Sequence, residues 1–186
     1  MIKKRHALAL WGIIVVWFAL SSCGQRAASI KVTELFCDHM IDPIAIDHRT
    51  PSLRWKIACD QRGARQSAYH ILVSKTPAML KKNIGDLWDS GIVPSDSLTG
   101  IRYQGLPLRS GEVCWWKVRV WDEQDKTAGW SQPATWEVGL LDSSDWQARW
   151  IAQRPGEESA APLFRRMFTI AKPVARARLR VYGLGR

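Results

Sequence analysis

The feature that most constrains this chain is the run 113–121, in which side chains of two kinds alternate. Because successive side chains of a β-strand point to opposite faces, the run has one apolar face and one mixed face. The apolar face comprises Cys114, Trp116, Val118 and Val120, and the mixed face comprises Trp115, Lys117, Arg119 and Trp121. The pattern predicts a long strand with one face in a core and the other half-exposed, where indoles pack over the stems of charged side chains.

Six further short runs rich in Val, Ile, Trp and Tyr are bounded by Gly, Pro and Asp, as strands are. They span 32–37, 52–58, 68–74, 87–90, 99–103 and 134–138. Between two of them, 76–81 reads as a helical turn with Thr76 as N-cap and Pro77 at the first helical position. Seven strands in about 110 residues predict an all-β chain with an immunoglobulin-like or fibronectin type III-like β-sandwich.

The N-terminus has the layout of an export signal. Lys3, Lys4 and Arg5 precede an uncharged apolar run, 7–20, which is shorter than the ~20 residues of a spanning helix. The sequence Leu20-Ser21-Ser22-Cys23 then resembles a bacterial lipoprotein box. The resemblance implies that residues 1–22 are removed and that Cys23 is lipidated, with 23–29 as a tether. An ordinary signal peptide with a chance cysteine is the alternative.

Sorting signals of lipoproteins give an expected location. Gly24 and Gln25 follow Cys23, with no Asp at the position that commonly retains lipoproteins in the inner membrane. The residues 26–31 also lack the acidic export tag of many surface lipoproteins. By resemblance to such signals, we expect an outer-membrane lipoprotein on the periplasmic face, with the membrane as partner through its lipid anchor.

Charge and cysteine content exclude two other classes of protein. Without residues 1–22, the chain has 24 Lys and Arg against 17 Asp and Glu, a formal charge of +7. The basic residues are interleaved with acidic and apolar ones except at 172–186, so solvated strand faces explain them better than nucleic-acid binding. Once Cys23 carries lipid, Cys37, Cys59 and Cys114 form an odd set, which excludes a complete disulfide framework. A Cys37–Cys59 bridge is conceivable, but buried free thiols are favoured.

No constellation predicts catalysis, a metal or a cofactor. The pairs Asp86/Asp89 and Asp142/Asp145 lie in predicted turns, where Asp normally accepts from backbone N–H groups. A cluster of metal-ligand residue types lacks zinc-site spacing and reads as a loop: Cys37, Asp38, His39, Asp42, Asp47 and His48. His70, in mid-strand, reads as a satisfied structural histidine. The HExxH, P-loop, GxGxxG and GxSxG motifs do not occur in the sequence.

Nine tryptophans follow residue 22, which raises the possibility of sugar binding. Trp55 and Trp116 fall on core faces, and Trp136, Trp146 and Trp150 read as packing between domains. Four others are expected to point outward, and they are the candidates for stacking on sugar rings: Trp88, Trp115, Trp121 and Trp130. Packing against another domain is the competing interpretation for these four.

Many ordered segments together resemble the N-terminal region of bacterial α-L-rhamnosidases of glycoside hydrolase family 78. They lie at 42–47, 51–55, 61–69, 87–91, 116–122, 130–131, 136–141 and 145–146, with Tyr103 and Leu108 between them. One departure concerns the corner 108–111 before the strand 113–121. The corner tyrosine of such sandwiches falls at Cys114 here, so we expect its hydrogen bond to be missing.

The resemblance implies a fibronectin type III-like domain at 30–141 and, at 142–186, the truncated start of a second β-sandwich with strands at 164–170 and 175–182. The family's catalytic glutamates lie on a barrel several hundred residues downstream, so no catalytic residue is carried over and the 186-residue chain is expected to be inactive alone. Its expected partners are the downstream domains and rhamnose-containing glycans. We expect a truncated gene product or an early frame break. A stand-alone sugar-binding or scaffold lipoprotein is the alternative function.

Overall fold

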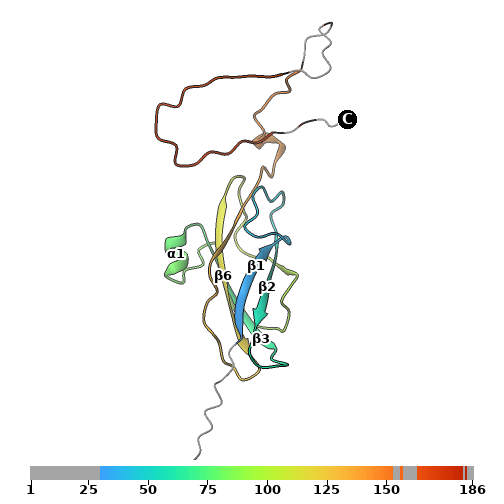
Figure 1. Ribbon diagram of the computed structural model, residues 1–186, viewed down its shortest axis with the longest axis vertical. Coiled ribbons are helices and arrows are strands. Elements are labelled where there is room, and N and C mark those ends of the chain that lie inside the picture. The colour runs from blue at the N-terminus through green and yellow to red at the C-terminus, as the bar shows by residue number, and fades with distance from the viewer. Residues whose placement is uncertain (1–29, 153–155, 157–162, 182, 184–186) are drawn as a thin grey trace, which may run out of the picture. The chain divides into compact units, whose positions relative to one another are not determined.

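The computed structural model describes residues 30–152, 156, 163–181 and 183 (Figure 1). They belong to two compact units, which meet in the sequence between Trp146 and Gln147. The expected signal segment, Cys23 and the tether 23–29 lie outside the described residues. No helix in the described part of the chain is long and apolar enough to cross a membrane.

Two antiparallel sheets build the first unit, which confirms the predicted all-β sandwich (Figure 1). One sheet has the strand order β1-β2-β5, and the other has the order β4-β3-β6-β7. In chain order the elements are β1 (Lys31–Cys37), β2 (Ser52–Ala58), β3 (Gln66–Ser74), α1 (Pro77–Lys81), β4 (Trp88–Pro94), β5 (Ile101–Arg102), β6 (Val113–Asp122), β7 (Ala134–Glu137) and a 3-10 turn, η1 (Ser143–Asp145). Each predicted strand of this unit has its counterpart, with ends displaced by a few residues.

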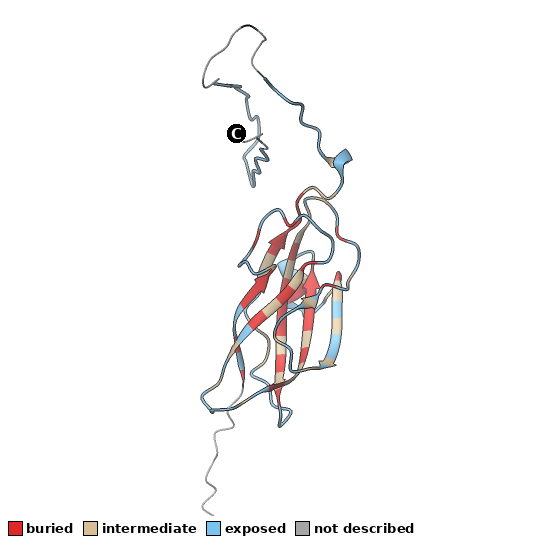
Figure 2. Ribbon diagram, turned by 90° about the vertical axis from the view of Figure 1, so that its right-hand side faces the viewer, coloured by how far each residue is buried: buried red, intermediate tan, exposed pale blue. Residues whose placement is uncertain are grey.

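The inner faces of the two sheets meet in one apolar core, where Figure 2 shows buried residues along the strands. The predicted inner face of β6, from Cys114 to Val120, is buried, as are Trp55 and Trp116. Trp136 is fully buried too, and its ring centroid lies 6.2 Å from that of Trp116 in edge-to-face geometry. Assigning Trp136 to packing between domains was therefore wrong, because β7 pairs with β6 and places Trp136 opposite Cys114.

The short helix α1 changes the outer face of the four-stranded sheet. It begins as predicted, because the Thr76 hydroxyl accepts a hydrogen bond from Met79 N at 3.3 Å and Pro77 occupies the first turn. The helix contacts β3 and β6 and buries Leu80. Leu72 and Lys117 lie on the outer face, yet both are less than a tenth exposed. The half-exposed face expected for β6 is therefore closed at Lys117.

A tyrosine hydrogen bond exists near the predicted corner, but another residue makes it. The hydroxyl of Tyr103 lies 2.8 Å from the carbonyl oxygen of Leu106 and 3.2 Å from that of Leu87. A Cβ on Gly105 would stand 2.5 Å from this hydroxyl, so only glycine fits there. Tyr103 thus joins the loop before β6 to the start of β4.

The three cysteines that the structure describes are free thiols, as favoured from the sequence, and two of them are buried. Cys37 and Cys114 are buried in the core, and Cys59 is partly exposed. Burial, the carboxylate of Asp38 and then the Cys114 thiol raise the pKa of the Cys37 thiol far above its ordinary value. Burial is also the largest cause of the raised pKa of Cys114. Both thiols therefore behave as small apolar core groups.

The second unit has no strand in its described residues, 147–152, 156, 163–181 and 183. The expected strands at 164–170 and 175–181 are therefore absent, while Tyr182 lies outside the described residues. Two strands alone cannot bury a face of their own, which explains the difference. Phe168, Leu179 and Val181 are each more than three-quarters exposed. The domain boundary after Leu141 remains a prediction.

Candidate functional site

The outer face of β3 and β6 carries a cluster of cations and indoles, which we call the cation–indole cluster. Its members are His70, Lys117, Arg119, Trp121 and Trp130. The Arg119 guanidinium lies 4.6 Å from the ring centroid of Trp121 and 4.8 Å from that of Trp130. Lys117 Nζ lies 4.8 Å from the Trp130 centroid, and the His70 ring lies 5.0 Å from it. Cations of the same chain thus already contact the ring faces of both indoles.

Lys117 is held by more than the indole. Its ammonium donates to the carbonyl oxygen of Leu80 at 2.7 Å and to Oδ1 of Asn83 at 2.6 Å. Burial, and then the nearby charge of Arg119, lower the pKa of Lys117. The ammonium therefore ties the last turn of α1 to β6, a role that alternation in β6 alone could not reveal.

The prediction of a satisfied His70 holds at one ring nitrogen only, because the buried Nδ1 has no hydrogen-bond partner among the described residues. Its Nε2 lies 2.6 Å from Oδ1 of Asp89, on the neighbouring strand β4. Burial raises the pKa of Asp89, but hydrogen bonds from Gly91 N and His70 outweigh that effect, so the pKa lies below its ordinary value. The pair fastens β4 to β3 next to Trp130.

The four sugar-stacking candidates do not form one platform. Trp88 is directed inward, contrary to expectation: it pairs with the buried Val73 and packs edge-to-face on Tyr103 at 5.5 Å. Trp115 shares the outer face of β6 with Trp121, but six residues of strand, about 20 Å, separate them. Only Trp121 and Trp130 are brought together, with Arg119 between them.

The carboxylates singled out in the sequence serve as hydrogen-bond acceptors. Asp86 lies in a loop, as expected, whereas Asp89 lies in β4 and not in the predicted turn, because it pairs with Leu72 of β3. Oδ1 of Asp86 accepts from Lys75 N at 3.0 Å, and Asp89 accepts from Gly91 N at 2.9 Å. Oδ2 of Asp38 lies 2.8 Å from His48 Nε2, while Oδ1 of Asp42 accepts from Thr135 N at 2.7 Å. No group of three or more His, Cys, Asp or Glu among the described residues is arranged to hold a metal ion.

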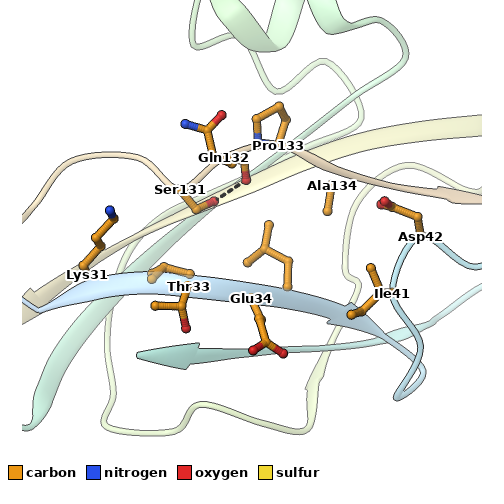
Figure 3. Close-up of a pocket in the computed structure, with 11 residues that line it drawn as sticks. Lys31, Thr33, Glu34, Ile41, Asp42, Ser131, Gln132, Pro133 and Ala134 are labelled. Carbon is orange, nitrogen blue, oxygen red and sulfur yellow. Dashed lines mark hydrogen bonds between the residues drawn. The ribbon is translucent and has the colours of Figure 1, made fainter. Parts of the chain in front are cut away.

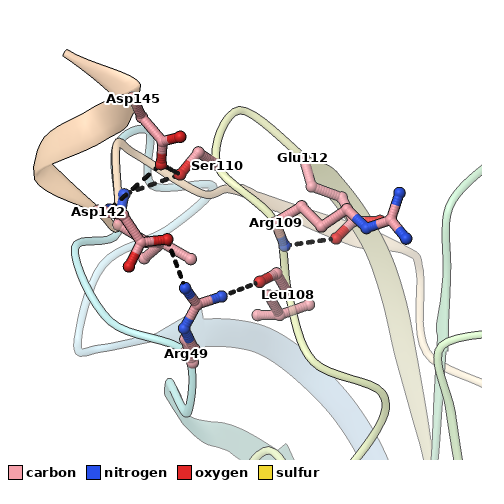
Figure 4. Close-up of polar contacts among 8 residues, drawn as sticks. Arg49, Leu108, Arg109, Ser110, Glu112, Asp142 and Asp145 are labelled. Atoms are coloured by element: carbon pink, nitrogen blue, oxygen red, sulfur yellow. Dashed lines mark hydrogen bonds and ion pairs between the residues drawn. The ribbon is translucent and has the colours of Figure 1, made fainter.

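Asp142 and Asp145 build a joint where the chain leaves the sandwich (Figure 4). Arg49 donates to the carbonyl oxygen of Leu108 at 2.6 Å and to Oδ2 of Asp142 at 2.7 Å. The Ser110 hydroxyl accepts from Leu141 N at 2.8 Å and donates to Asp145. The hydrogen bond from Ser110 is the largest cause of the lowered pKa of Asp145. We call these contacts the Arg49–Asp142 joint.

Sequence reasoning missed Arg49 and Ser110 as partners in this joint, because 93 residues separate Arg49 from Asp142. One local signal was available. The spacing Asp142-Ser143-Ser144-Asp145 is that of a capping box, and the structure has the reciprocal bonds of that motif.

A cleft of about 410 Å³ lies between β1 and the segment before β7 (Figure 3). Its lining residues are Lys31, Val32, Thr33, Glu34, Leu35, Ile41, Asp42, Ser131, Gln132, Pro133 and Ala134. Two carboxylates lie among them, but Glu34 pairs with Lys56 at 2.9 Å and Asp42 with the backbone of Thr135. The cleft therefore combines apolar walls with carboxylates that already have partners.

Comparisons with known proteins place this sandwich in a family. A model of the family described as Rha78A-like, N-terminal immunoglobulin domain, matches residues 32–142. The chain belongs to this family. An α-L-rhamnosidase of Alteromonas sp. (strain LOR) is 33% identical over 94% of the chain, and the match covers 20% of that relative. The match thus identifies the N-terminal region of an α-L-rhamnosidase.

Solved structures agree with this assignment. The α-L-rhamnosidase from Dictyoglumus thermophilum is similar over 67% of this chain and 14% of its own, with a TM-score of 0.65 and 34% identity. The Streptomyces avermitilis α-L-rhamnosidase complexed with L-rhamnose is similar over 68% of this chain and 12% of its own, with a TM-score of 0.65 and 37% identity. The 186-residue chain spans about a fifth or less of the length of the curated relatives it matches.

Proposed function

We propose that this Rha78A-like chain is a non-catalytic N-terminal module of an exported α-L-rhamnosidase. In this proposal, the complete enzyme removes terminal α-L-rhamnose from glycans or glycosides by an inverting mechanism. The module serves as a spacer and as a platform on which other domains pack. The proposal draws on the relatives named α-L-rhamnosidase and on the sandwich fold.

The use of the carboxylates carries the non-catalytic part of this proposal. An inverting glycosidase needs two free carboxyl groups about 6.5–9.5 Å apart, flanking a space for a sugar and a water. In the cleft beside β1, Glu34 forms an ion pair with Lys56, and Asp42 accepts a hydrogen bond from Thr135 N. In the other candidate pairs, Asp86 and Asp89 accept hydrogen bonds from backbone N–H groups, and Asp142 accepts one from Arg49. These groups act as structural acceptors and not as an acid–base pair.

The test is an assay of the purified 186-residue chain on an aryl α-L-rhamnoside. We expect no release of the aryl group above the blank. A family member that contains the catalytic barrel, assayed in parallel, shows that the conditions support turnover. Appreciable turnover by the short chain alone would overturn the non-catalytic assignment.

A stand-alone sugar-binding function is the second candidate, and one observation favours it: Trp121 and Trp130 lie together on one sheet face. Against it, the guanidinium of Arg119 already contacts both rings. Tryptophan fluorescence titrated with rhamnose-containing oligosaccharides separates the candidates. A saturable change that is lost in Trp121→Ala supports binding, and a flat titration supports the spacer.

Export and lipidation are the remaining part of the proposal. They rest on the basic residues 3–5, the apolar run 7–20 and the box that ends at Cys23. Two or more acyl chains on one residue give stable anchoring, whereas one chain gives only marginal binding. We expect the Cys23→Ser variant to be absent from the membrane pellet and to incorporate no labelled fatty acid. The parent protein should be found in the pellet and carry the label. A variant that still pellets and resists salt extraction would contradict the lipid anchor.

A further inference from the structure

We infer that the loop between β1 and β2 carries a docking surface for another folded domain of the same, longer polypeptide. The surface consists of Met40, Ile41 and Ile44, and we call it the apolar loop surface. The inference rests on the proposed function, in which this chain is one module of a larger enzyme.

The three side chains are exposed in a way that the rest of the sandwich is not. Met40 is 50% exposed, and Ile41 and Ile44 are each 62% exposed. The other large apolar residues that the structure exposes in the first unit are separated from one another in the sequence: Ile84, Ile92, Leu106 and Trp146. Single exposed apolar residues are ordinary, whereas a concentration of them marks an interaction site.

The backbone beneath this surface is fixed. Cys37 and Met40 exchange two backbone hydrogen bonds of 2.9 and 3.0 Å. On the other side, Glu137 N donates to the carbonyl oxygen of Pro43 at 2.9 Å, and Ile46 N donates to that of Glu137 at 2.9 Å. The segment 43–46 is thereby attached to β7. A backbone that is already fixed loses little further entropy when a partner covers its side chains, as a pre-organised interface requires.

The same loop adopts strained conformations to present these side chains. Asp38, His39, Asp42 and Ala45 have φ values between 44° and 68°. Asp and His tolerate this left-handed region, but Ala45 has no polar side chain that compensates for the strain. Such conformations persist where the surrounding structure imposes them, and they concentrate at binding sites.

The position of the loop identifies the kind of partner. Its last part carries Arg49, which holds Leu108 and Asp142 in the Arg49–Asp142 joint. The loop therefore lies at the end of the sandwich from which the chain continues toward Trp146, as Figure 1 shows. The polypeptide therefore leaves the sandwich at the end that carries the apolar loop surface.

The size of the surface favours a tethered partner. Three side chains are far fewer than the 20–30 residues that each partner contributes to a stable interface of about 1,600 Å². A covalent link supplies a high effective concentration, so a small contact suffices. The relatives are long enough to contain such a partner domain, because the matched region is only 13–20% of their chains.

Hydroxyl-radical footprinting tests the inference, because it reports the exposure of individual side chains. The 186-residue chain is compared with a longer polypeptide, in which the reading frame is restored past codon 186 so that the downstream domains follow it. We expect oxidation of Met40 to be at least fivefold slower in the longer polypeptide, with slower modification of Ile41 and Ile44. Ile92 and Leu106, which are 60% and 56% exposed, are the matched controls and should react equally in both samples.

A double variant gives a second measurement. Ile41→Ser with Ile44→Ser should restore fast oxidation of Met40 in the longer polypeptide, while Ile92→Ser should not. Oxidation of Met40 at equal rates in the short and long forms overturns the inference. Protection of Met40 that increases with concentration in the short chain identifies a second copy as the occupant and also overturns it.

The same samples separate this inference from the proposed function. Hydrolysis of an aryl α-L-rhamnoside by the longer polypeptide tests the function and is independent of Met40. Hydrolysis with an unprotected Met40 overturns only the docking surface. A protected Met40 without hydrolysis overturns only the enzymatic assignment.

Discussion

Lys117 is a charged residue on the outer face of the four-stranded sheet that is nevertheless buried. Its ammonium donates hydrogen bonds to the carbonyl oxygen of Leu80 and to Oδ1 of Asn83. We call this attachment of α1 to β6 the clamp. Lys117→Met keeps the aliphatic stem and removes both hydrogen bonds. We expect the free energy of unfolding to fall by about 1–3 kcal/mol in urea titrations. Lys81→Met, on the exposed surface of the same helix, is the control and should change it by less than about 0.5 kcal/mol. Equal effects of the two variants would contradict the clamp.

The thiols of Cys37 and Cys114 make stability depend on alkaline pH. Burial raises the pKa of both thiols in the folded protein, whereas an unfolded thiol ionises near pH ~8.5. Above that pH the unfolded chain therefore binds fewer protons than the folded one, and stability falls as pH rises. Between pH ~9 and ~10 we expect a loss of about 1 kcal/mol for each thiol, and the slope approaches about 1.4 kcal/mol per pH unit at higher pH.

Urea titrations under reducing conditions across this range measure the slope. Cys37→Ala combined with Cys114→Ala should flatten it, although the double variant is less stable at every pH. Cys59→Ala, at a partly exposed position, should leave it unchanged. A double variant with the slope of the parent would show that other groups cause the pH dependence.

At the scale of elements, the Arg49–Asp142 joint holds the segment after β7 against the sandwich. Ser110→Ala removes the acceptor of Leu141 N and the donor to Asp145. We expect hydrogen exchange at the amide of Leu141 to accelerate at least tenfold, while the amide of Val120, in the centre of the sheet, keeps its protection. Ser144→Ala is the matched control in the same segment. Unchanged exchange at Leu141 in Ser110→Ala would show that other contacts hold the segment.

The elements also show what sequence reasoning reaches. Alternation predicted the inner face of β6, and the Thr76-Pro77 pair predicted the start of α1, because both signals are local. Trp136 was assigned wrongly and Arg49 was overlooked, because their environments depend on strands and loops distant in sequence. Trp88 was placed outward because the face of a short strand cannot be fixed without its pairing partner.

At the scale of the whole molecule, the two units differ in how far they bury their apolar residues. The first buries its apolar residues between two sheets, whereas the described part of the second exposes them. The resemblance to a family of longer proteins predicted strands for the second unit. Two strands in isolation have no further strand or helix against which they can bury their apolar residues. The strands expected from the resemblance are therefore not formed in the described residues of the second unit.

This contrast predicts where a protease acts on the 186-residue chain. Proteases cleave exposed segments whose backbone lacks protection, and the sandwich with its joint is protected through Asp145. We expect limited trypsinolysis to give a stable core that ends between Leu141 and Trp150, with Arg149 as the main site, identified by intact mass. Arg149→Gln should move the end of the core to a later basic residue and leave its thermal unfolding unchanged. Protection of the whole chain through Arg186 would show that the second unit has a stable fold of its own.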